Sequence, residues 1–170
     1  AYSVRVRILP GLAELAQGKV LVSELKAVDT VDLLGRSEVE ADPDLLNKNI
    51  NNKVVLITGA GGSIGSEIAR QALKGKPNQL IILDSNEYAL YLLKMEIEST
   101  NYDVNLHSII ANVTNEKRIK EVCKAFKVDT IYHSAAYKHV PLVEENPFEG
   151  VSNNIFGTIS CLQAAVDTEV

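Results

Sequence analysis

Two kinds of hydrophobic pattern alternate between residues 53 and 170 of this chain. Short runs of consecutive apolar residues, beginning with 53–58, are typical of strands that are buried on both faces. Each run is followed by a segment in which apolar residues recur every three or four positions, which is the spacing of one helix face. The pattern predicts strands at 53–58, 80–83, 104–110 and 130–133, and a last, long helix that begins at Asn146-Pro147.

The predicted helices are identified by their apolar stripes, and Gly75 and Pro77 end the first of them. The stripes, in chain order, are Ile64, Ile68, Ala69, Ala72 and Leu73; Tyr88, Tyr91, Leu92 and Met95; Ile119, Val122, Cys123 and Phe126; and Phe148, Val151, Ile155, Ile159, Leu162 and Val166. Strands that alternate with helices predict an α/β fold, a parallel sheet with helices on both faces. Right-handed crossovers favour a doubly wound strand order of 3-2-1-4.

The first 52 residues do not follow this alternation. Val4, Val6 and Ile8 alternate with polar residues, as in a half-exposed strand, and residues 20–22 predict a second, brief strand. A charged, proline-broken stretch then indicates a linker. We expect an N-terminal appendage too short to hold its own core, a linker, and a truncated main domain, at residues 1–41, 42–52 and 53–170 respectively.

The composition argues against several classes of function. The 170 residues carry a net charge of -5 without a cluster of Lys or Arg, so we expect no nucleic-acid partner. No apolar run approaches the ~20 residues of a membrane span, and the first residues lack the apolar core of a signal peptide. Cys123 and Cys161 lack metal-ligand spacing, so we expect no metal site but two buried free thiols in a reducing compartment.

A cluster of glycines lies where the first strand meets the first helix. Residues 54–65 read V-V-L-I-T-G-A-G-G-S-I-G, with four of the ten glycines of the chain in seven positions. Gly59 permits a tight turn, Gly62 permits a pyrophosphate to approach the main chain, and Gly65 permits close packing of helix and strand. The N-terminus of the helix offers free N–H groups and partial positive charge to phosphate oxygens. The arrangement predicts a dinucleotide site.

An acidic residue lies where the adenosine ribose of a dinucleotide would be held. Asp84 ends the second predicted strand, nineteen positions after Gly65, close to the ~20 expected for this role. A glycine turn that only packs the helix would leave this placement unexplained. The carboxylate would repel a 2′-phosphate, so NAD is favoured over NADP. Ser85 and Asn86 bind the ribose and adenine region or cap the next helix, and the two roles are compatible.

The end of the third predicted strand lies at the same edge of the sheet. It reads A-N-V at 111–113, and an adenine ring would rest beside it. Asn112 can donate to and accept from an adenine edge, and Val113 lies next to it. The alternative is that Asn112 is an ordinary turn residue, and the sequence favours neither interpretation.

The fourth predicted strand leads into the loop beside strand one, at the switch point where doubly wound sheets bind ligands. Ala135 and Ala136 are small enough for a ribose or nicotinamide to pass over them. Lys138 and His139 follow, where they would meet a phosphate or a sugar. The alternative interpretation of these two residues is solvated loop charge.

Three motifs together resemble a known family. They are T-G-A-G-G-S-I-G-S-E at 58–67, A-A-Y-K-H-V-P-L-V-E at 135–144 and N-N-I-F-G-T at 153–158, which are similar to motifs of the extended short-chain dehydrogenase/reductase superfamily. More narrowly, the chain resembles the CapD/WbpM-type polysaccharide-biosynthesis proteins, nucleotide-sugar 4,6-dehydratases that typically act on UDP-N-acetylglucosamine. The stretch V-D-L-L-G-R at 31–36 also resembles the segment before the catalytic domain of the large, membrane-anchored members, so the similarity covers nearly the whole chain.

The resemblance implies a role for each matching residue. The phosphates of NAD would be contacted by Thr58, Gly59, Gly62, Ser63, Ile64 and Gly65, and the adenosine half by Asp84, Ser85, Asn86, Asn112 and Val113. The nicotinamide side would be lined by Ala135, Ala136 and Tyr137, and the UDP-sugar would be approached by Lys138, His139 and Asn154. Asn154 would support the site from the last helix, unless it is a helix-surface residue. Asn112 departs from the Asp that relatives often carry, but it can still meet an adenine amine.

The resemblance also implies a dehydration in three stages: hydride passes from sugar C4 to NAD, water is lost across C5–C6, and hydride returns to C6. The strings that supply the acid and base in the family, S-[TM]-D-K and a later [YM]-x-x-x-K, are absent from this sequence, and so is an initiator Met. We therefore expect a fragment that holds the cofactor half of the site, has no catalytic residue and does not turn over substrate alone.

Two other interpretations are compatible with the sequence. One is a nucleotide-sugar epimerase or reductase of the same superfamily, and the other is a non-catalytic NAD-binding or assembly module. Because the fourth strand and the last helix would lack a neighbour in a fragment, we expect a homo-oligomer that covers them, and the alternative is pairing with the N-terminal strand. We expect a cytoplasmic location without membrane contact by this chain, and any anchoring of the parent would come from upstream segments.

Overall fold

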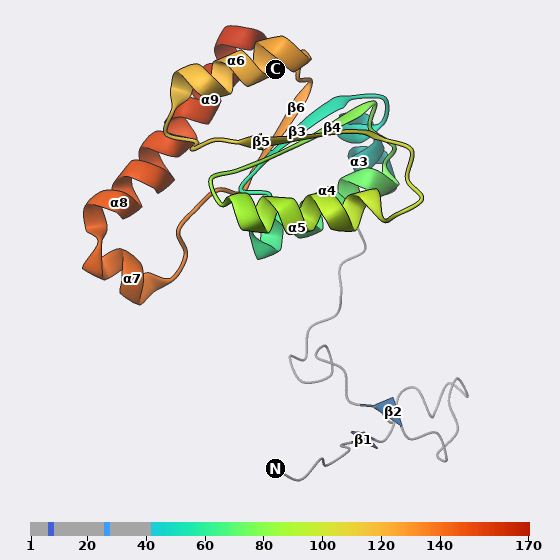
Figure 1. The fold of residues 1–170 in the computed structure, drawn as a ribbon, viewed down its shortest axis with the longest axis horizontal. Coiled ribbons are helices and arrows are strands. Elements are labelled where there is room, and N and C mark those ends of the chain that lie inside the picture. The colour runs from blue at the N-terminus through green and yellow to red at the C-terminus, as the bar shows by residue number, and fades with distance from the viewer. Residues whose placement is uncertain (1–6, 9–25, 28–41) are drawn as a thin grey trace. The chain divides into compact units, whose positions relative to one another are not determined.

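The computed structural model describes residues 7–8, 26–27 and 42–170, and the chain divides into two compact units, 1–41 and 42–170 (Figure 1). In the first unit, strand β1 (Arg7–Ile8) pairs antiparallel with β2 (Lys26–Ala27). The strand predicted around Val4 and Val6 therefore falls on the described residues only at its end. The strand predicted at 20–22 and the V-D-L-L-G-R stretch lie outside them.

The second unit is built on a four-stranded parallel sheet. Its strands are β3 (Val54–Thr58), β4 (Gln79–Asp84), β5 (Asn105–Ile110) and β6 (Thr130–His133). They lie in the order β5-β4-β3-β6, which confirms the predicted order 3-2-1-4. In the centre of the sheet, Val55 is in register with Leu80 on one side and with Thr130 on the other.

Helices cover both faces of this sheet, as predicted. The helices of this unit are α3 (Pro43–Ile50), α4 (Ser63–Lys74), α5 (Glu87–Glu98), α6 (Glu116–Phe126), α7 (Val140–Glu145), α8 (Pro147–Val151) and α9 (Gly157–Thr168), with a π-helical turn η1 (Ser152–Phe156) between α8 and α9, and α7 and α8 extend beyond the sheet (Figure 1). Figure 1 shows α6 and α9 on one face and α4 and α5 on the other. Within residues 42–170, none of the helices combines the length and apolar character that a bilayer crossing requires.

The core consists of two apolar layers, one on each face of the sheet. Because side chains of a strand alternate between faces, Val55 and Ile57 pack toward α4 and α5. Val54 and Leu56 pack toward α6 and α9. All five residues of β3 are buried, which is why its first four residues are all apolar instead of alternating with polar ones. The rigid centre of the fold is thus the strand that leads into the glycine loop.

Residues 42–52, which the sequence predicted to be a linker, contain the helix α3. Asp42 caps it, since its Oδ1 accepts from the backbone N–H groups of Asp44 (2.9 Å) and Leu45 (3.3 Å). Pro43 occupies the first helical position, where its fixed φ is favourable and its missing N–H costs nothing. Ile50, at the end of α3, is buried in the core. The proline therefore begins a helix here rather than breaking one.

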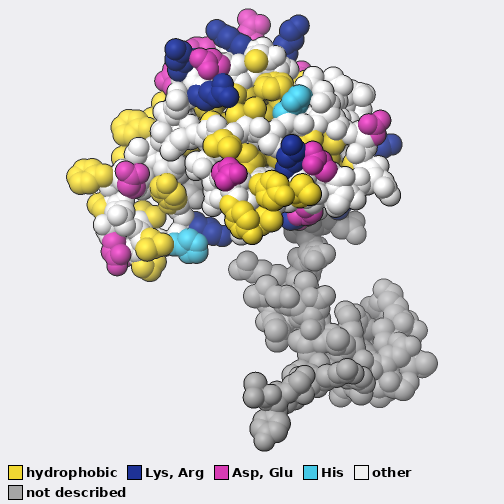
Figure 2. Space-filling view, in the orientation of Figure 1, with side chains coloured by type: hydrophobic (Ala, Val, Ile, Leu, Met, Phe, Trp, Pro, Cys, Tyr) yellow, Lys and Arg dark blue, Asp and Glu magenta, His cyan; other side chains and the backbone are white. Residues whose placement is uncertain are grey.

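The predicted packing face of α5 is wrong. The stripe of Tyr88, Tyr91, Leu92 and Met95 is exposed, and the helix instead buries Leu90, Leu93 and Ile97. Both stripes have helical spacing because the helix is apolar around most of its circumference. The aliphatic stripe faces the sheet, and the stripe with two tyrosine hydroxyls faces water, where those hydroxyls stay hydrogen-bonded. Figure 2 shows apolar side chains gathered over α5 on this face of the molecule.

The predicted apolar face of the last helix is also exposed. The helix starts at Pro147 as predicted, but it contains η1 and buries the small residues Gly157, Ser160, Cys161 and Ala164. A Cβ at Gly157 would lie 2.8 Å from Val113 Cγ2, so close packing demands small residues on this side. The large side chains that the sequence placed on one face, Phe148, Val151, Ile155, Ile159, Leu162 and Val166, all point to solvent.

The two cysteines are buried free thiols, as the sequence indicated. Cys123 lies on α6 and Cys161 on α9, and both belong to the same apolar layer. Burial raises the pKa of both thiols, that of Cys161 to about 11, so neither is a nucleophile at neutral pH.

Adjacent leucines on α5 test the corrected packing face. Leu93 is 3% exposed and Leu92 is 48% exposed. We expect Leu93→Ala to lower the free energy of unfolding by about 2–4 kcal/mol because it leaves a cavity. Leu92→Ala should change it by less than about 1 kcal/mol. Urea denaturation of the two variants measures the difference. Equal losses, or a larger loss for Leu92→Ala, would contradict the packing described here.

Candidate functional site

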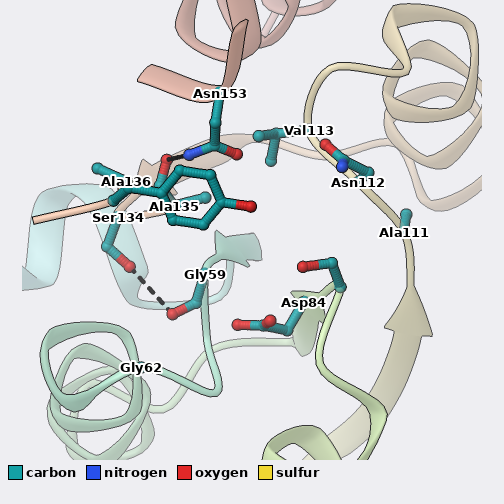
Figure 3. A pocket seen from close by; sticks show the side chains of 12 residues that line it. Gly59, Gly62, Asp84, Ala111, Asn112, Val113, Ser134, Ala135, Ala136 and Asn153 are labelled. Carbon is teal, nitrogen blue, oxygen red and sulfur yellow. Dashed lines mark hydrogen bonds between the residues drawn. The ribbon is translucent and has the colours of Figure 1, made fainter. Parts of the chain in front are cut away.

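A crevice at the carboxyl edge of the sheet brings together the loops that follow all four strands. It contains a cavity of about 140 Å³. The cavity is lined by Gly59, Gly62, Asp84, Ser85, Ala111, Asn112, Val113, Ser134, Ala135, Ala136, Tyr137 and Asn153. Figure 3 shows these residues surrounding the glycine loop, with Asn153 reaching in from η1. Doubly wound sheets bind ligands at this place, where the strand order reverses.

The glycine loop lies directly against the loop after β6. Gly59 has a φ of +67°, and a Cβ on it would lie 2.6 Å from the backbone of Ala135. A Cβ on Gly65 would lie 2.1 Å from the carbonyl oxygen of Gly59. The Ser134 hydroxyl also donates to the Thr58 carbonyl at 2.8 Å. The β3–α4 turn thus has no room for side chains on its inner side.

The N-terminus of α4 has no cap of its own. Gly62 is its N-cap residue, no side chain in the described part of the chain caps it, and its first turn contains no acidic residue. By contrast, α3, α5 and α6 are capped by Asp42, Asn86 and Asn115, and each has an acidic residue in its first turn. The first N–H groups of α4 therefore keep their hydrogen-bonding capacity and positive potential for an anion.

The residues that follow the N-cap were predicted to contact phosphates. Ser63 and Ile64 begin α4 at the rim of the crevice, outside the cavity lining, and the Ile64 side chain is 62% exposed. What they offer to a ligand is therefore main-chain N–H, which no side chain obstructs. Gly65 lies beneath the loop, where it packs against Gly59 rather than facing the cavity.

Asp84 is held in place at the wall of the crevice that adjoins the glycine loop. Its Oδ2 accepts from the Gly61 N–H and its Oδ1 from the Asn86 N–H, both at 2.8 Å. A Cβ on Gly61 would lie 2.7 Å from the Ala89 Cβ, so this glycine permits the loop to reach Asp84. Each carboxylate oxygen keeps a lone pair for a ligand.

The polar residues beside Asp84 are engaged in local structure. The Asn86 side chain accepts from the Ala89 N–H at 3.0 Å and caps α5, which is the second of its two predicted roles. Asn112 forms a turn, since its Oδ1 accepts from the N–H and the hydroxyl of Thr114, both at 2.9 Å. Its amide nitrogen is left for a ligand. Ser85 and Val113 line the cavity as expected.

The loop after β6 is fastened by two asparagines of η1. The Asn154 side chain accepts from the Tyr137 N–H at 2.8 Å and donates to the Tyr137 carbonyl at 2.9 Å. The Asn153 amide donates to the Ala135 carbonyl at 3.4 Å (Figure 3). Asn154 thus supports the site by holding the main chain of Tyr137, and it does not line the cavity itself.

Thr58 and His133 lie beneath the crevice. Thr58 is completely buried, and its hydroxyl is 2.7 Å from His133 Nδ1. The Thr58 side chain is therefore not directed at the predicted phosphate position. His133 Nε2 lies 3.1 Å from the Thr158 hydroxyl on α9, and burial lowers the pKa of His133.

Lys138 and His139 face a neighbouring cavity of about 410 Å³. Its other walls come from α7 and α8 and include Leu142, Val143 and Glu149. Ala136 and Tyr137 line both cavities, so the two spaces adjoin at these residues. Of the residues predicted to approach the sugar, Lys138 and His139 thus face this adjoining space, whereas Asn154 lines neither cavity.

Three residues of the site, Gly61, Ser134 and Asn153, had no role predicted from the sequence. Gly61 stood within the quoted glycine string, and its spacing did not distinguish it from its neighbours. Ser134 and Asn153 act through hydrogen bonds to backbone carbonyls, which leave no signature in a sequence. In the described ranges, no three His, Cys, Asp or Glu side chains gather as metal ligands.

The fold and the motifs have counterparts in known proteins. Residues 55–170 match the family described as polysaccharide biosynthesis protein. The chain is 43% identical to capsular polysaccharide biosynthesis protein CapD of Staphylococcus aureus, over 95% of this chain and 27% of that protein. It is 33% identical to the inverting UDP-N-acetylglucosamine 4,6-dehydratase of Campylobacter jejuni, over 71% of this chain and 34% of that protein.

A solved structure shares the fold. It is DesIV, a dTDP-glucose 4,6-dehydratase from Streptomyces venezuelae, with NAD and TYD bound. The TM-score is 0.60 at 28% identity, over 69% of this chain and 37% of that one. The chain spans only about a quarter to a third of the length of the curated relatives named above. Since the family match covers most of the chain and includes the whole crevice, the chain belongs to the polysaccharide biosynthesis protein family.

Proposed function

We propose that residues 53–170 bind NAD in the crevice and form the cofactor-binding part of a nucleotide-sugar 4,6-dehydratase of the UDP-N-acetylglucosamine type, acting in polysaccharide biosynthesis. One observation carries the proposal. The start of α4, which no side chain of the described residues caps, lies beside Asp84, whose carboxylate is fixed by the Gly61 and Asn86 N–H groups. Relatives named as dehydratases and the NAD-bound DesIV support this proposal.

The chemistry of the walls fits NAD group by group. The pyrophosphate fits the start of α4, where no acidic residue repels it. The ribose hydroxyls fit the free lone pairs of Asp84, and the adenine fits the end of β5, where Val113 is apolar and Asn112 offers an amide. The small side chains of Ala135 and Ala136 leave room for the nicotinamide ribose. When bound, NAD supplies a hydride acceptor.

The UDP-sugar would lie toward the second cavity. Lys138 and His139 line it and provide donors for phosphate or sugar oxygens. Tyr137 stands between the two spaces, and Asn154 fixes its main chain through two hydrogen bonds. These residues bind and orient, and the described chain contains no group that we assign to proton transfer. We therefore propose that this piece is inactive without the rest of the parent protein.

We further infer that the chain associates with a second copy through the exposed face of α8 and α9. Six large apolar side chains occupy this face, and Phe148 is 89% exposed. Exposed apolar surface of this extent marks an interaction site, and a two-fold axis along the helix would bury the same face on both copies. A cytoplasmic location is proposed from the two buried free thiols.

A charge placed at the start of α4 tests the site. Ile64→Glu adds a carboxylate to the first turn, and Ile64→Gln is the matched neutral control. Without ligand, the free energy of unfolding of Ile64→Glu should exceed that of Ile64→Gln by about 0.3–1 kcal/mol, because the carboxylate complements the helix dipole. With NAD, calorimetric titration should give an affinity about tenfold weaker for Ile64→Glu, because the carboxylate repels the pyrophosphate. Equal NAD affinities of the two variants would sink the proposed site.

The choice of dinucleotide tests Asp84. We expect the chain to bind NAD more tightly than NADP, because the carboxylate repels a 2′-phosphate. Asp84→Asn should weaken NAD binding about tenfold or more, since it removes a charged acceptor. It should also reduce the ratio of the affinity for NAD to the affinity for NADP. Asp103→Asn, a change of the same charge at an exposed position, should leave both affinities unchanged. A wild-type preference for NADP would refute the role given to Asp84.

Light scattering tests the association of two copies. The wild-type chain should have twice the mass of one chain, and Ile159→Glu on α9 should have the mass of a single chain. Leu92→Glu, at the exposed face of α5, is the control and should stay at twice the mass. A monomeric wild-type chain, or an Ile159→Glu variant that stays associated, would count against this surface.

A further inference from the structure

His133 joins three separate elements of the fold through its two ring nitrogens. It is the last residue of β6, and Nδ1 lies 2.7 Å from the hydroxyl of Thr58 at the end of β3. Nε2 lies 3.1 Å from the hydroxyl of Thr158 on α9. Thr58 is fully buried, so its hydroxyl depends on this contact for a partner within the described chain.

The direction of every hydrogen bond in this chain of groups can be assigned. The Thr158 hydroxyl lies 2.7 Å from the Asn154 carbonyl, which can only accept, so Thr158 donates its single proton there. Thr158 Oγ1 must then accept from His133 Nε2–H. A neutral imidazole carries one proton, so Nδ1 accepts from the Thr58 hydroxyl. Burial lowers the pKa of His133, which keeps the ring neutral at pH 7.

Both ends of this chain of groups lead to the cofactor crevice. Thr58 is followed at once by Gly59, whose backbone is in contact with Ala135. Asn154, at the other end, holds the N–H and the carbonyl of Tyr137 with its side chain. The link therefore connects the glycine loop to the loop that separates the two cavities, and it passes entirely beneath the ligand space.

We propose that His133, as the neutral Nε2–H tautomer, is a positioning residue that couples the glycine loop to Tyr137 through Thr58, Thr158 and Asn154. This coupling rests on the proposed function in one respect, which is that the two coupled loops hold NAD. A histidine that only satisfied the two hydroxyls would have the same tautomer, but breaking its contact with Thr58 would then leave the Tyr137 main chain unchanged, so hydrogen exchange of the Tyr137 N–H distinguishes the two roles.

The tautomer can be measured directly in the ligand-free chain. Of the three histidines, His107, His133 and His139, the signals of His133 are identified by their loss in His133→Gln. Long-range ¹⁵N–¹H spectra at neutral pH should show a protonated Nε2 and an unprotonated Nδ1 for His133. The Nδ1–H tautomer, or a charged ring, would overturn the proposal. The tautomer is read in the wild-type chain, and if His133→Gln fails to fold, His107→Gln and His139→Gln identify the His133 signals by elimination.

The coupling is tested by removing the hydroxyls without changing side-chain shape. Thr58→Val should speed hydrogen exchange of the Tyr137 N–H, although Thr58 does not contact Tyr137, because the link that holds Asn154 is broken. Thr168→Val is the matched control, since its hydroxyl donates to the Ala164 carbonyl on the same helix without a histidine. Unchanged Tyr137 exchange in Thr58→Val, or an equal effect of Thr168→Val, would overturn the proposal.

A double-mutant cycle carries the test to the ligand. Thr58→Val and Thr158→Val should each weaken NAD binding about threefold to tenfold, as expected for one lost hydrogen bond. The double variant should bind NAD with about the same affinity as the single variant that binds it less tightly. The reason is that both changes break the same link. Losses that multiply would overturn the coupling. If the wild-type chain does not bind NAD but the tautomer and the Tyr137 exchange behave as stated, the proposed function fails and the coupling stands.

Discussion

Backbone contact between two loops is the constraint on which the rest of the structure depends. The main chain of Gly59 lies against that of Ala135, and Gly65 packs against the Gly59 carbonyl, at distances that exclude any Cβ. This contact turns the chain sharply enough for α4 to begin at the rim of the crevice, where no side chain of the described residues caps its first N–H groups. The buried strands β3 and β6 fix the two loops in register, so the ligand site follows from the sheet.

The glycine loop is held by a hydrogen bond to a charged group and by another between neutral groups. Asp84 secures the outer side of the glycine loop through the Gly61 N–H, and Ser134 secures the inner side through the Thr58 carbonyl. Helix pairs farther from the site are joined by ion pairs, such as Arg70 with Glu96 between α4 and α5. Those pairs are largely exposed and add little stability. The site is thus built mainly from backbone geometry and short polar contacts.

The sequence was a good guide where the physical signal is local. Alternation of strands and helices predicted the sheet and its order, because buried parallel strands must be continuously apolar. The glycine spacing and Asp84 located the crevice, because a tight turn and a charged partner each restrict the residue type. The sequence did not predict which faces of α5 and α9 are buried. Both helices carry apolar residues on more than one side, and only the packing partner decides which side is buried.

Other features could not be read from the sequence because they depend on contacts between distant residues. Asp42 and Pro43 were interpreted as a break, although the same pair begins α3. His133 satisfies hydroxyl groups far away in the chain, so its role follows from the fold alone, and the fold shows that the supporting role expected of Asn154 is exerted on the main chain of Tyr137. The exposed apolar faces of α5, α8 and α9 likewise follow only from the structure, because it shows which side of each helix packs against the rest of the fold.

A titration of the ¹⁵N-labelled chain with NAD tests the central claim most directly. The account predicts that the backbone amide signals of Ser63, Ile64 and Gly65 shift furthest, because their N–H groups take up the pyrophosphate at the start of α4. It would be contradicted if NAD left these three signals in place while others moved, or if millimolar NAD moved none.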